Sequence, residues 1–201
     1  MAISLSKGQK VSLTKENPGL TEIRVGLGWD EVQQEQKKGF FASLLSAPKE
    51  DIDCDASVYL LKNGKLASED DIVFFNNLKH KSGSVYHHGD NLTGGGEGDD
   101  EQISINLTKV PAEYDRIVIA VNIYKANERK QHFGLVQNAF IRVVNKTNNT
   151  ELCRYNLTDN YSGSTGIIFG EVYRHEGEWK FNAVGEGIQA SYITEVAKIF
   201  K

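Results

Sequence analysis

The sequence predicts an all-β fold, an antiparallel β-sandwich of two sheets with a few short helices. Three observations indicate this fold class. Short runs of β-branched and aromatic residues, alternating with polar residues, recur along the chain. Turn-forming groups such as Asn-Gly, Pro-Gly and Ser-Gly separate most of these runs. Stretches with the spacing of an amphipathic helix are few. About ten short strands with short connections are typical of two packed sheets.

Glu176-Gly177 separates the last two expected strands and is interpreted as the tip of a β-hairpin. The expected strands are 9–13, 22–27, 57–61, 72–75, 102–107, 116–123, 139–145, 151–156, 166–174 and 178–184.

Helix is expected at two places. Residues 190–200 carry apolar side chains at helical spacing and predict a C-terminal amphipathic helix on the sandwich. Residues 126–133 predict a short helix. The segment 31–50 is rich in Gln and Lys in its first half and is interpreted as an insertion or mobile segment. The length of 201 residues suits a single domain, which we expect to span 1–201.

Composition narrows the classes of function. The net charge of -4 and the absence of a basic stripe argue against nucleic acid as a partner. The N-terminus has no apolar signal region, and no apolar run is long enough to span a membrane, so we expect a cytoplasmic protein. In that reducing compartment the two cysteines, Cys54 and Cys153, are expected to be free thiols.

The stretch 89–101 is the strongest candidate for a functional site. It holds five carboxylates, at Asp90, Glu97, Asp99, Asp100 and Glu101, with no Lys or Arg among them. Five like charges this close repel one another unless a cation neutralises them. The glycines at 94, 95, 96 and 98 let the backbone curl, so that carbonyl, carboxylate and amide oxygens, including that of Asn91, can face one ion. These oxygens favour Ca²⁺, and the alternative for an isolated acidic loop is a solvated turn.

A second acidic cluster lies upstream, at Asp51, Asp53 and Asp55. Alternate residues of a strand point to one side, so these carboxylates are expected to share one side at the start of a strand. The cluster is not an EF-hand, since Ala56 stands at the sixth position and Lys62 at the twelfth. The amide of Asn76 adds a further oxygen. We expect the two acidic loops to converge at one end of the sandwich and to hold one or two calcium ions.

Other chemistry has weaker signals. His87 and His88 precede the acidic loop and could bind zinc together with a carboxylate, but neighbouring residues on a strand face opposite ways. We therefore prefer two exposed histidines to a zinc site. No nucleophile elbow and no P-loop is present in the sequence. The alternative to a non-enzymatic metal-binding protein is a metal-dependent hydrolase or phosphotransferase that uses the same carboxylates.

Several motifs resemble those of the TerD family of tellurite-resistance and stress-response proteins. They are Gly28-Trp29-Asp30, Asp53-x-Asp55-Ala56-Ser57, Phe75-Asn76-Asn77-Leu78 and, above all, the stretch from Gly89-Asp90-Asn91 to Asp99-Asp100-Glu101. The likeness covers nearly the whole chain and continues through 137–143, 154–158 and 169–181. The segment between Asp30 and Asp51 departs from the family pattern by being longer and richer in Gln and Lys.

The resemblance implies a calcium-binding β-sandwich that is not an enzyme. It further implies partners among other tellurite-resistance and stress proteins, with peripheral association with the membrane through them. The family's metal residues carry over onto Asp53, Asp55, Asp90, Asn91, Asp99, Asp100 and Glu101, and Asp30 and Asn76 match further family positions.

Overall fold

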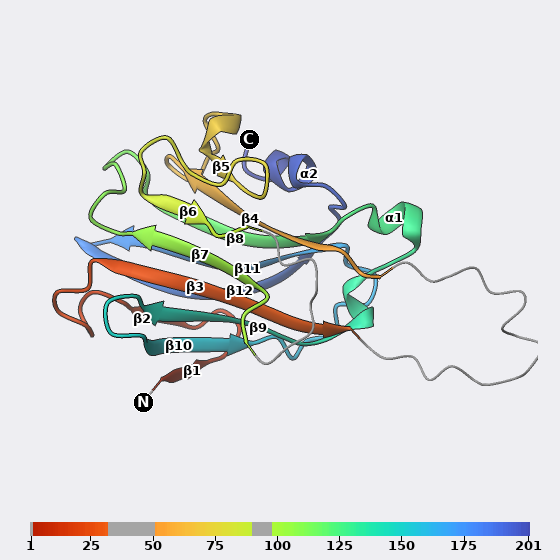
Figure 1. Ribbon diagram of the computed structural model, residues 1–201, viewed down its shortest axis with the longest axis horizontal. Coiled ribbons are helices and arrows are strands. Elements are labelled where there is room, and N and C mark those ends of the chain that lie inside the picture. Colours follow the sequence, from red (N-terminus) through yellow and green to blue (C-terminus); the bar gives the residue numbers. More distant parts are fainter. Residues whose placement is uncertain (1, 32–50, 90–97) are drawn as a thin grey trace, which may run out of the picture.

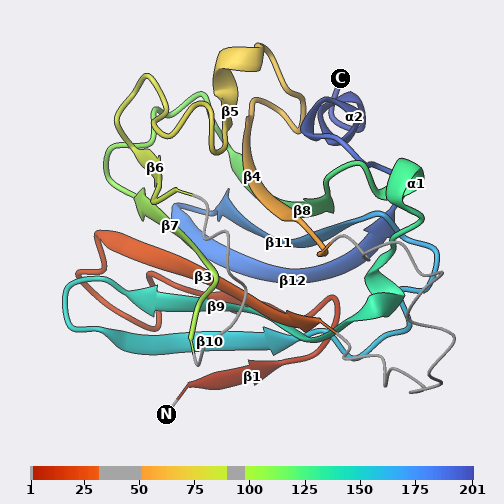
Figure 2. The same ribbon diagram turned by 45° about the vertical axis from the view of Figure 1, so that its right-hand side comes forward.

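Two six-stranded sheets face each other in this computed structural model, which describes residues 2–31, 51–89 and 98–201 (Figure 1, Figure 2). All neighbouring strands pair antiparallel except β1 and β10, which are parallel. Sheet A has the order β1 (Ile3–Leu5), β10 (Thr150–Asn156), β9 (Val136–Asn145), β3 (Glu22–Glu31), β7 (Glu101–Asn106) and β6 (Val85–His87). Sheet B has the order β2 (Lys10–Ser12), β12 (Glu178–Ile188), β11 (Gly166–His175), β8 (Arg116–Ile123), β4 (Cys54–Leu61) and β5 (Ile72–Val73).

The core between the sheets follows from the alternation of side chains along each strand. In β3, the odd-numbered residues Ile23, Val25 and Leu27 are fully buried and face the core. In β4, Cys54, Ala56, Val58 and Leu60 belong to the same core. The other face of β4, with Tyr59 and Leu61, belongs to a second apolar cluster on the outer side of sheet B. Sheet B is therefore apolar on both faces, which explains why its β4 is buried throughout.

A C-terminal helix covers part of that outer face. This helix, α2 (Ile193–Lys198), lies on sheet B in both ribbon views (Figure 1, Figure 2). The Tyr59 hydroxyl donates to the Ile193 carbonyl at 3.0 Å, and the Tyr59 and Phe200 rings lie 5.4 Å apart. The remaining helical elements are short: η1 (Glu69–Asp71), α1 (Ala126–Arg129) and η2 (Phe133–Leu135).

The predicted fold class is confirmed, and each of the ten expected strands overlaps an observed one. Two three-residue edge strands, β1 and β6, were not expected. The C-terminal helix and the short helix after residue 125 are present, the latter ending already at Arg129. The hairpin at Glu176-Gly177 is confirmed, since His175 pairs with Glu178. Cys54 and Cys153 are both buried free thiols, as expected. Apart from Glu31, the proposed insertion 31–50 lies outside the described residues.

Candidate metal centre

The described end of the acidic loop, Gly98–Glu101, runs onto the outer face of sheet A. Its backbone is fixed there because the Asp100 N–H donates to the Leu27 carbonyl at 2.7 Å and Glu101 pairs with Leu27 at the start of β7. The even-numbered residues of β3 face away from the core at this point, and two of them are Gly26 and Gly28. The absence of side chains there leaves room for the acidic residues to lie directly on the sheet.

Asp99 occupies the space above Gly26. A Cβ at Gly26 would overlap the Asp99 carboxylate, so only glycine fits beneath it. Arg142 of β9 holds both Asp99 oxygens, with Nε to Oδ1 at 2.7 Å and Nη2 to Oδ2 at 3.1 Å. The Asp99 side chain has no exposed surface, and this hydrogen bonding raises the pKa of Arg142. This bidentate ion pair is strong and directional, and it holds the loop against the sheet.

Asp100 lies beside Asp99 but has a different environment. Its Oδ2 accepts the backbone N–H of Trp29 at 2.8 Å. Burial raises the pKa of Asp100 above its usual value, the Trp29 hydrogen bond opposes this, and the charges of Asp30 and Asp99 raise it further. Asp30 accepts from the Asn138 side chain at 2.8 Å. Two neighbouring carboxylates therefore crowd negative charge around Asp100, and in the described part of the chain the nearby Arg142 guanidinium is already paired with Asp99. This crowding is the electrostatic condition that favours a bound metal.

Glu101 points into the sandwich. It is 2% exposed, and its Oε2 lies 3.4 Å from Nε2 of His87, which is 1% exposed. The expectation that His87 is exposed is wrong: β6 joins the edge of sheet A and directs residues 85 and 87 to the core. His88 faces outward as expected, and its Nε2 lies 2.8 Å from the Ser104 hydroxyl.

The upstream residues lie on the other side of the molecule. Asp55 is on the outer face of sheet B, because its neighbours Cys54 and Ala56 face the core. Asn76 is exposed in the turn after β5, and both residues line one cavity beside α2. Asp53 lies 3.8 Å from an Arg129 guanidinium nitrogen. The structure thus brings Asp55 and Asn76 together, but it separates them from Asp99 and Asp100 by the thickness of both sheets.

Two of the expected ligands, Asp90 and Asn91, lie outside the described residues. Among residues 2–31, 51–89 and 98–201, no three His, Cys, Asp or Glu side chains are grouped as a metal site would require. The described carboxylates therefore form part of a candidate centre, not a complete coordination shell.

A comparison with protein-family models matches residues 1–200 to the TerD domain. This chain belongs to the TerD family. It is 53% identical to the stress response protein SCP2 of Bacillus subtilis, over 98% of each chain. It is 49% identical to the tellurium resistance protein TerD of Serratia marcescens, over 93% of this chain and 91% of that protein. The names of these relatives describe stress response and tellurium resistance and name no enzymatic activity.

A solved structure of a Streptomyces coelicolor homologue of the telluride resistance protein TerD has the same fold. It aligns with a TM-score of 0.65 at 19% identity and covers 91% of this chain and 99% of that one. This likeness supports the fold of the TerD-family protein described here. In the part of the chain that the structure describes, no helix is long and apolar enough to cross a bilayer.

Sequence reasoning missed three participants in the centre of this TerD-family protein: Gly26, the Trp29 backbone and Arg142. Gly26 carried a signal, because a glycine in the middle of a strand often marks a close approach by another group. Arg142 carried a weaker one, as the one charged residue of β9. Its pairing with Asp99 spans 43 positions in sequence and depends on β9 lying beside β3.

Proposed function

We propose that this TerD-family protein is a non-enzymatic, calcium-binding module of a stress response of the tellurium-resistance type. The environment of Asp100 supports the proposal most directly. Its carboxylate is half-buried between the charges of Asp30 and Asp99, and its pKa is raised. A divalent cation would stabilise the ionised carboxylate and offset the repulsion, which gives calcium binding a favourable free energy at this position.

In this proposal Asp100 and Asp30 are the described ligands, and Asp90 and Asn91 supply further oxygens. Calcium takes six to eight oxygen ligands in a flexible geometry, so two carboxylates of the sheet surface need the oxygens of the acidic loop to complete its shell. Asp99 acts as an anchor because Arg142 already occupies both of its oxygens. Glu101 acts from within the core, where it lies against His87.

The proposed biological role is an interaction module. Calcium held by the acidic loop on the outer face of sheet A would create a docking surface that is complete only when the ion is bound. The occupants would be other stress or tellurium-resistance proteins, and any association with the membrane would be peripheral and made through them. The sequence identity to a stress response protein and to a tellurium resistance protein supports this class of role.

The hydrolase alternative has no comparable support. Two-metal chemistry needs carboxylates that hold two ions close together, whereas Asp55 and Asp100 lie on opposite outer faces of the sandwich. The relatives' names point to no reaction.

Isothermal titration calorimetry tests the calcium proposal. Protein stripped of metal with a chelator is titrated with calcium and, separately, with magnesium. We expect heat from calcium and weaker binding of magnesium, which requires a stricter octahedral geometry. Asp100→Asn should weaken calcium binding at least about tenfold, the equivalent of roughly 1.4 kcal/mol.

The matched control is Asp159→Asn, which removes an exposed carboxylate that pairs with Lys7. It should leave the calcium isotherm unchanged. Absence of calcium heat in the wild type, or equal loss in both variants, would refute the proposal.

A further inference from the structure

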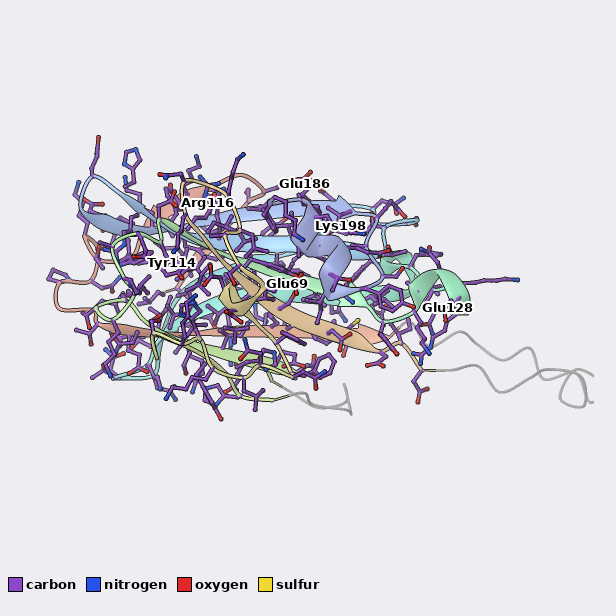
Figure 3. All side chains as sticks on the ribbon, turned by 90° about the horizontal axis from the view of Figure 1, so that it is seen from above. Glu69, Tyr114, Arg116, Glu128, Glu186 and Lys198 are labelled. Carbon is purple, nitrogen blue, oxygen red and sulfur yellow. The ribbon has the colours of Figure 1, made fainter. Side chains whose placement is uncertain are left out.

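A cavity of about 680 Å³ opens on the outer face of sheet B. It lies between α2 and the turn that follows β5, on the side seen from above in Figure 3, where Glu69 of η1 and Lys198 of α2 are labelled. Its volume is in the range of small-molecule sites in proteins. The described residues of the proposed calcium centre, Asp30 and Asp100, do not line it, so the cavity is separate from that centre.

The turn after β5 holds Phe75 and Asn76 at its tip, and both residues line the cavity. The Phe74 N–H donates to the Asn77 carbonyl at 3.1 Å and the Asn77 N–H to the Phe74 carbonyl at 2.9 Å, which closes the turn. The Asn77 side-chain amide donates to the Ile72 carbonyl at 2.7 Å. Phe75 is 39% exposed, and the exposed Asn76 amide makes no hydrogen bond with the described residues. A fixed turn therefore places a free amide donor and acceptor beside an open aromatic ring.

Aromatic side chains form much of the cavity wall. The Phe74 and Phe75 rings are an edge-to-face pair 5.4 Å apart, and the Tyr124 and Tyr192 rings are a second such pair at 5.8 Å. The Tyr192 hydroxyl donates to Glu128 at 2.6 Å, which fixes its ring. A further aromatic ring that enters this wall gains edge-to-face or offset contacts in addition to the burial of its apolar area.

The charged residues that line the cavity balance one another. Glu69 and Asp70 bring two carboxylates to the exposed mouth. Lys198 and Lys201 bring two ammonium groups there, and Lys201 lies 4.0 Å from Glu69. Asp55, 7% exposed, already has an interaction partner. A charged ligand would therefore lose hydration among aromatic rings without meeting a net opposite charge, and an uncharged ligand avoids this cost.

We propose that this cavity binds a free small molecule, an uncharged aromatic ring that carries an amide group. The ring contacts the Phe75 and Tyr192 rings. The ligand amide and the Asn76 amide exchange two hydrogen bonds, because each has an N–H donor beside a carbonyl acceptor. Benzamide is the simplest compound of this class. A bare metal ion is a poorer fit, because aromatic walls cannot replace its hydration shell.

A series of probes of matched shape tests the proposal. The ¹⁵N-labelled full chain is titrated with neutral benzamide, anionic benzoate and cationic benzamidinium, and backbone amide shifts are followed by NMR. We expect benzamide to shift the amides of Phe75, Asn76 and Tyr192 in a saturable way. Both ions should bind at least about fivefold more weakly, because they lose hydration without a net opposite charge. Cyclohexanecarboxamide, which has a saturated ring, should bind several-fold more weakly than benzamide. Equal or tighter binding of either ion, or equal binding of the saturated amide, would overturn the proposal.

Three variants locate the effect. Asn76→Asp keeps the shape of the side chain but removes its donor and adds a negative charge. It should weaken benzamide binding about three- to tenfold and make benzamidinium the tighter ligand. Phe75→Ala should weaken benzamide binding several-fold. Leu78→Ala is the matched control, since Leu78 is 36% exposed and does not line the cavity, and it should bind as the wild type does.

Circular dichroism verifies that each variant is folded. Unchanged ligand preference in Asn76→Asp, or equal losses in Phe75→Ala and Leu78→Ala, would contradict the assignment. If Phe75→Ala is not folded, Asn76→Asp, an isosteric change at an exposed position, decides the outcome.

A last titration separates this cavity from a metal site. Calcium chloride is added to the benzamide complex of Asp100→Asn, in which the proposed calcium centre is weakened. Retention of the benzamide shifts supports the proposal. Displacement of benzamide by calcium would overturn it in favour of a metal ion held by Asp55 and Asn76. The outcome is independent of calcium binding at Asp100, which the calorimetry tests separately.

Discussion

Asp71 shows how one buried oxygen can organise several segments. Its Oδ1 receives the Tyr114 hydroxyl at 2.7 Å and the Lys81 ammonium at 2.9 Å, and lies 3.3 Å from His80 Nε2. The His80 Nδ1 accepts the Ser82 backbone N–H at 3.3 Å, which leaves the ring proton on Nε2, facing Asp71. A neutral histidine is therefore part of the connection between β5 and β6.

This cluster predicts acid sensitivity. Burial lowers the pKa of His80, and this effect exceeds the opposing effect of Asp71, which raises that pKa. The charges of Lys81 and Lys62 lower the His80 pKa further. Burial alone would raise the pKa of Asp71, but its hydrogen bonds outweigh this and lower it. Both shifts act in one direction: each group favours the fold above its unfolded pKa and loses that contribution as pH falls through its folded pKa. Stability should decrease below about pH 6.5 and again below about pH 4.

Urea unfolding between about pH 7.5 and pH 5 measures the first decrease. His80→Gln should lower stability by about 1–3 kcal/mol at neutral pH and flatten the pH dependence in this interval. His175→Gln, at an exposed position, is the control and should keep the wild-type slope. A His80→Gln variant with the wild-type slope would contradict the assignment.

Three consecutive residues of the acidic loop show what sequence could and could not predict at this scale. Their acidity predicted a shared role, but Asp99 pairs with Arg142, Asp100 accepts from Trp29, and Glu101 lies beside His87 in the core. Alternation predicts that neighbours face opposite ways. Alternation cannot predict which cation or backbone group from a distant strand will contact each residue, because the contact depends on the order of strands in the sheet.

At the scale of elements, two tight turns have the same backbone conformation but different residues. Asn63-Gly64 has φ angles of 52° and 74°, and Glu176-Gly177 has 52° and 79°. Both residues of each turn are left-handed, as a type I′ hairpin requires. Asn adopts this conformation far more readily than Glu, so Glu176 is strained where Asn63 is not.

Glu176→Asn should therefore stabilise the protein by about 0.5–1 kcal/mol, and the reciprocal change Asn63→Glu should destabilise it by a similar amount. Thermal and urea unfolding of the two single variants provide the measurement, with each serving as the control for the other. Destabilisation by Glu176→Asn would show that contacts of the glutamate side chain, and not its backbone conformation, determine this turn.

The sequence predicted every strand of six or more residues, and the expected strands 9–13 and 72–75 also overlap the short β2 and β5. β1 and β6 were missed because three residues show little alternation, and each exists because an adjacent edge supplies hydrogen bonds. The expected strand 22–27 ended too early, because Gly26 and Gly28 disfavour a strand by propensity. Pairing with β9 carries β3 on to Glu31, and the glycines receive Asp99 and the Phe140 ring.

For the whole molecule, the main correction concerns which faces carry which residues. Their oxygen-bearing side chains and the family resemblance grouped Asp53, Asp55 and Asn76 with the acidic loop, but sheet membership decides their location. β4 belongs to sheet B and β7 to sheet A, so their outward residues lie on opposite surfaces. The sequence alone does not show which strands pair, so it does not specify the sheet to which each strand belongs. The two acidic clusters were therefore expected to converge, whereas their described residues lie on opposite faces.

This arrangement predicts that calcium stabilisation is insensitive to sheet B. At a free calcium concentration of about one hundred times its dissociation constant, one bound ion adds about 2.7 kcal/mol to the free energy of unfolding. The melting temperature should then rise by roughly 5–10 °C in the wild type. The rise should persist in Asp55→Asn and be reduced in Asp100→Asn. Loss of the rise in Asp55→Asn would indicate a calcium ion on the opposite face.

The N-terminal residues of the chain connect the edges of both sheets. β1 pairs with β10 through Ile3 and Cys153, and β2 pairs with β12 through Val11 and Phe181. A ribosome adding about 5–20 residues per second synthesises these first strands roughly 8–35 s before their partners. Both edge strands therefore lack their native partners until β10 and β12 have been synthesised, and the two sheet edges that they complete can form only late in folding.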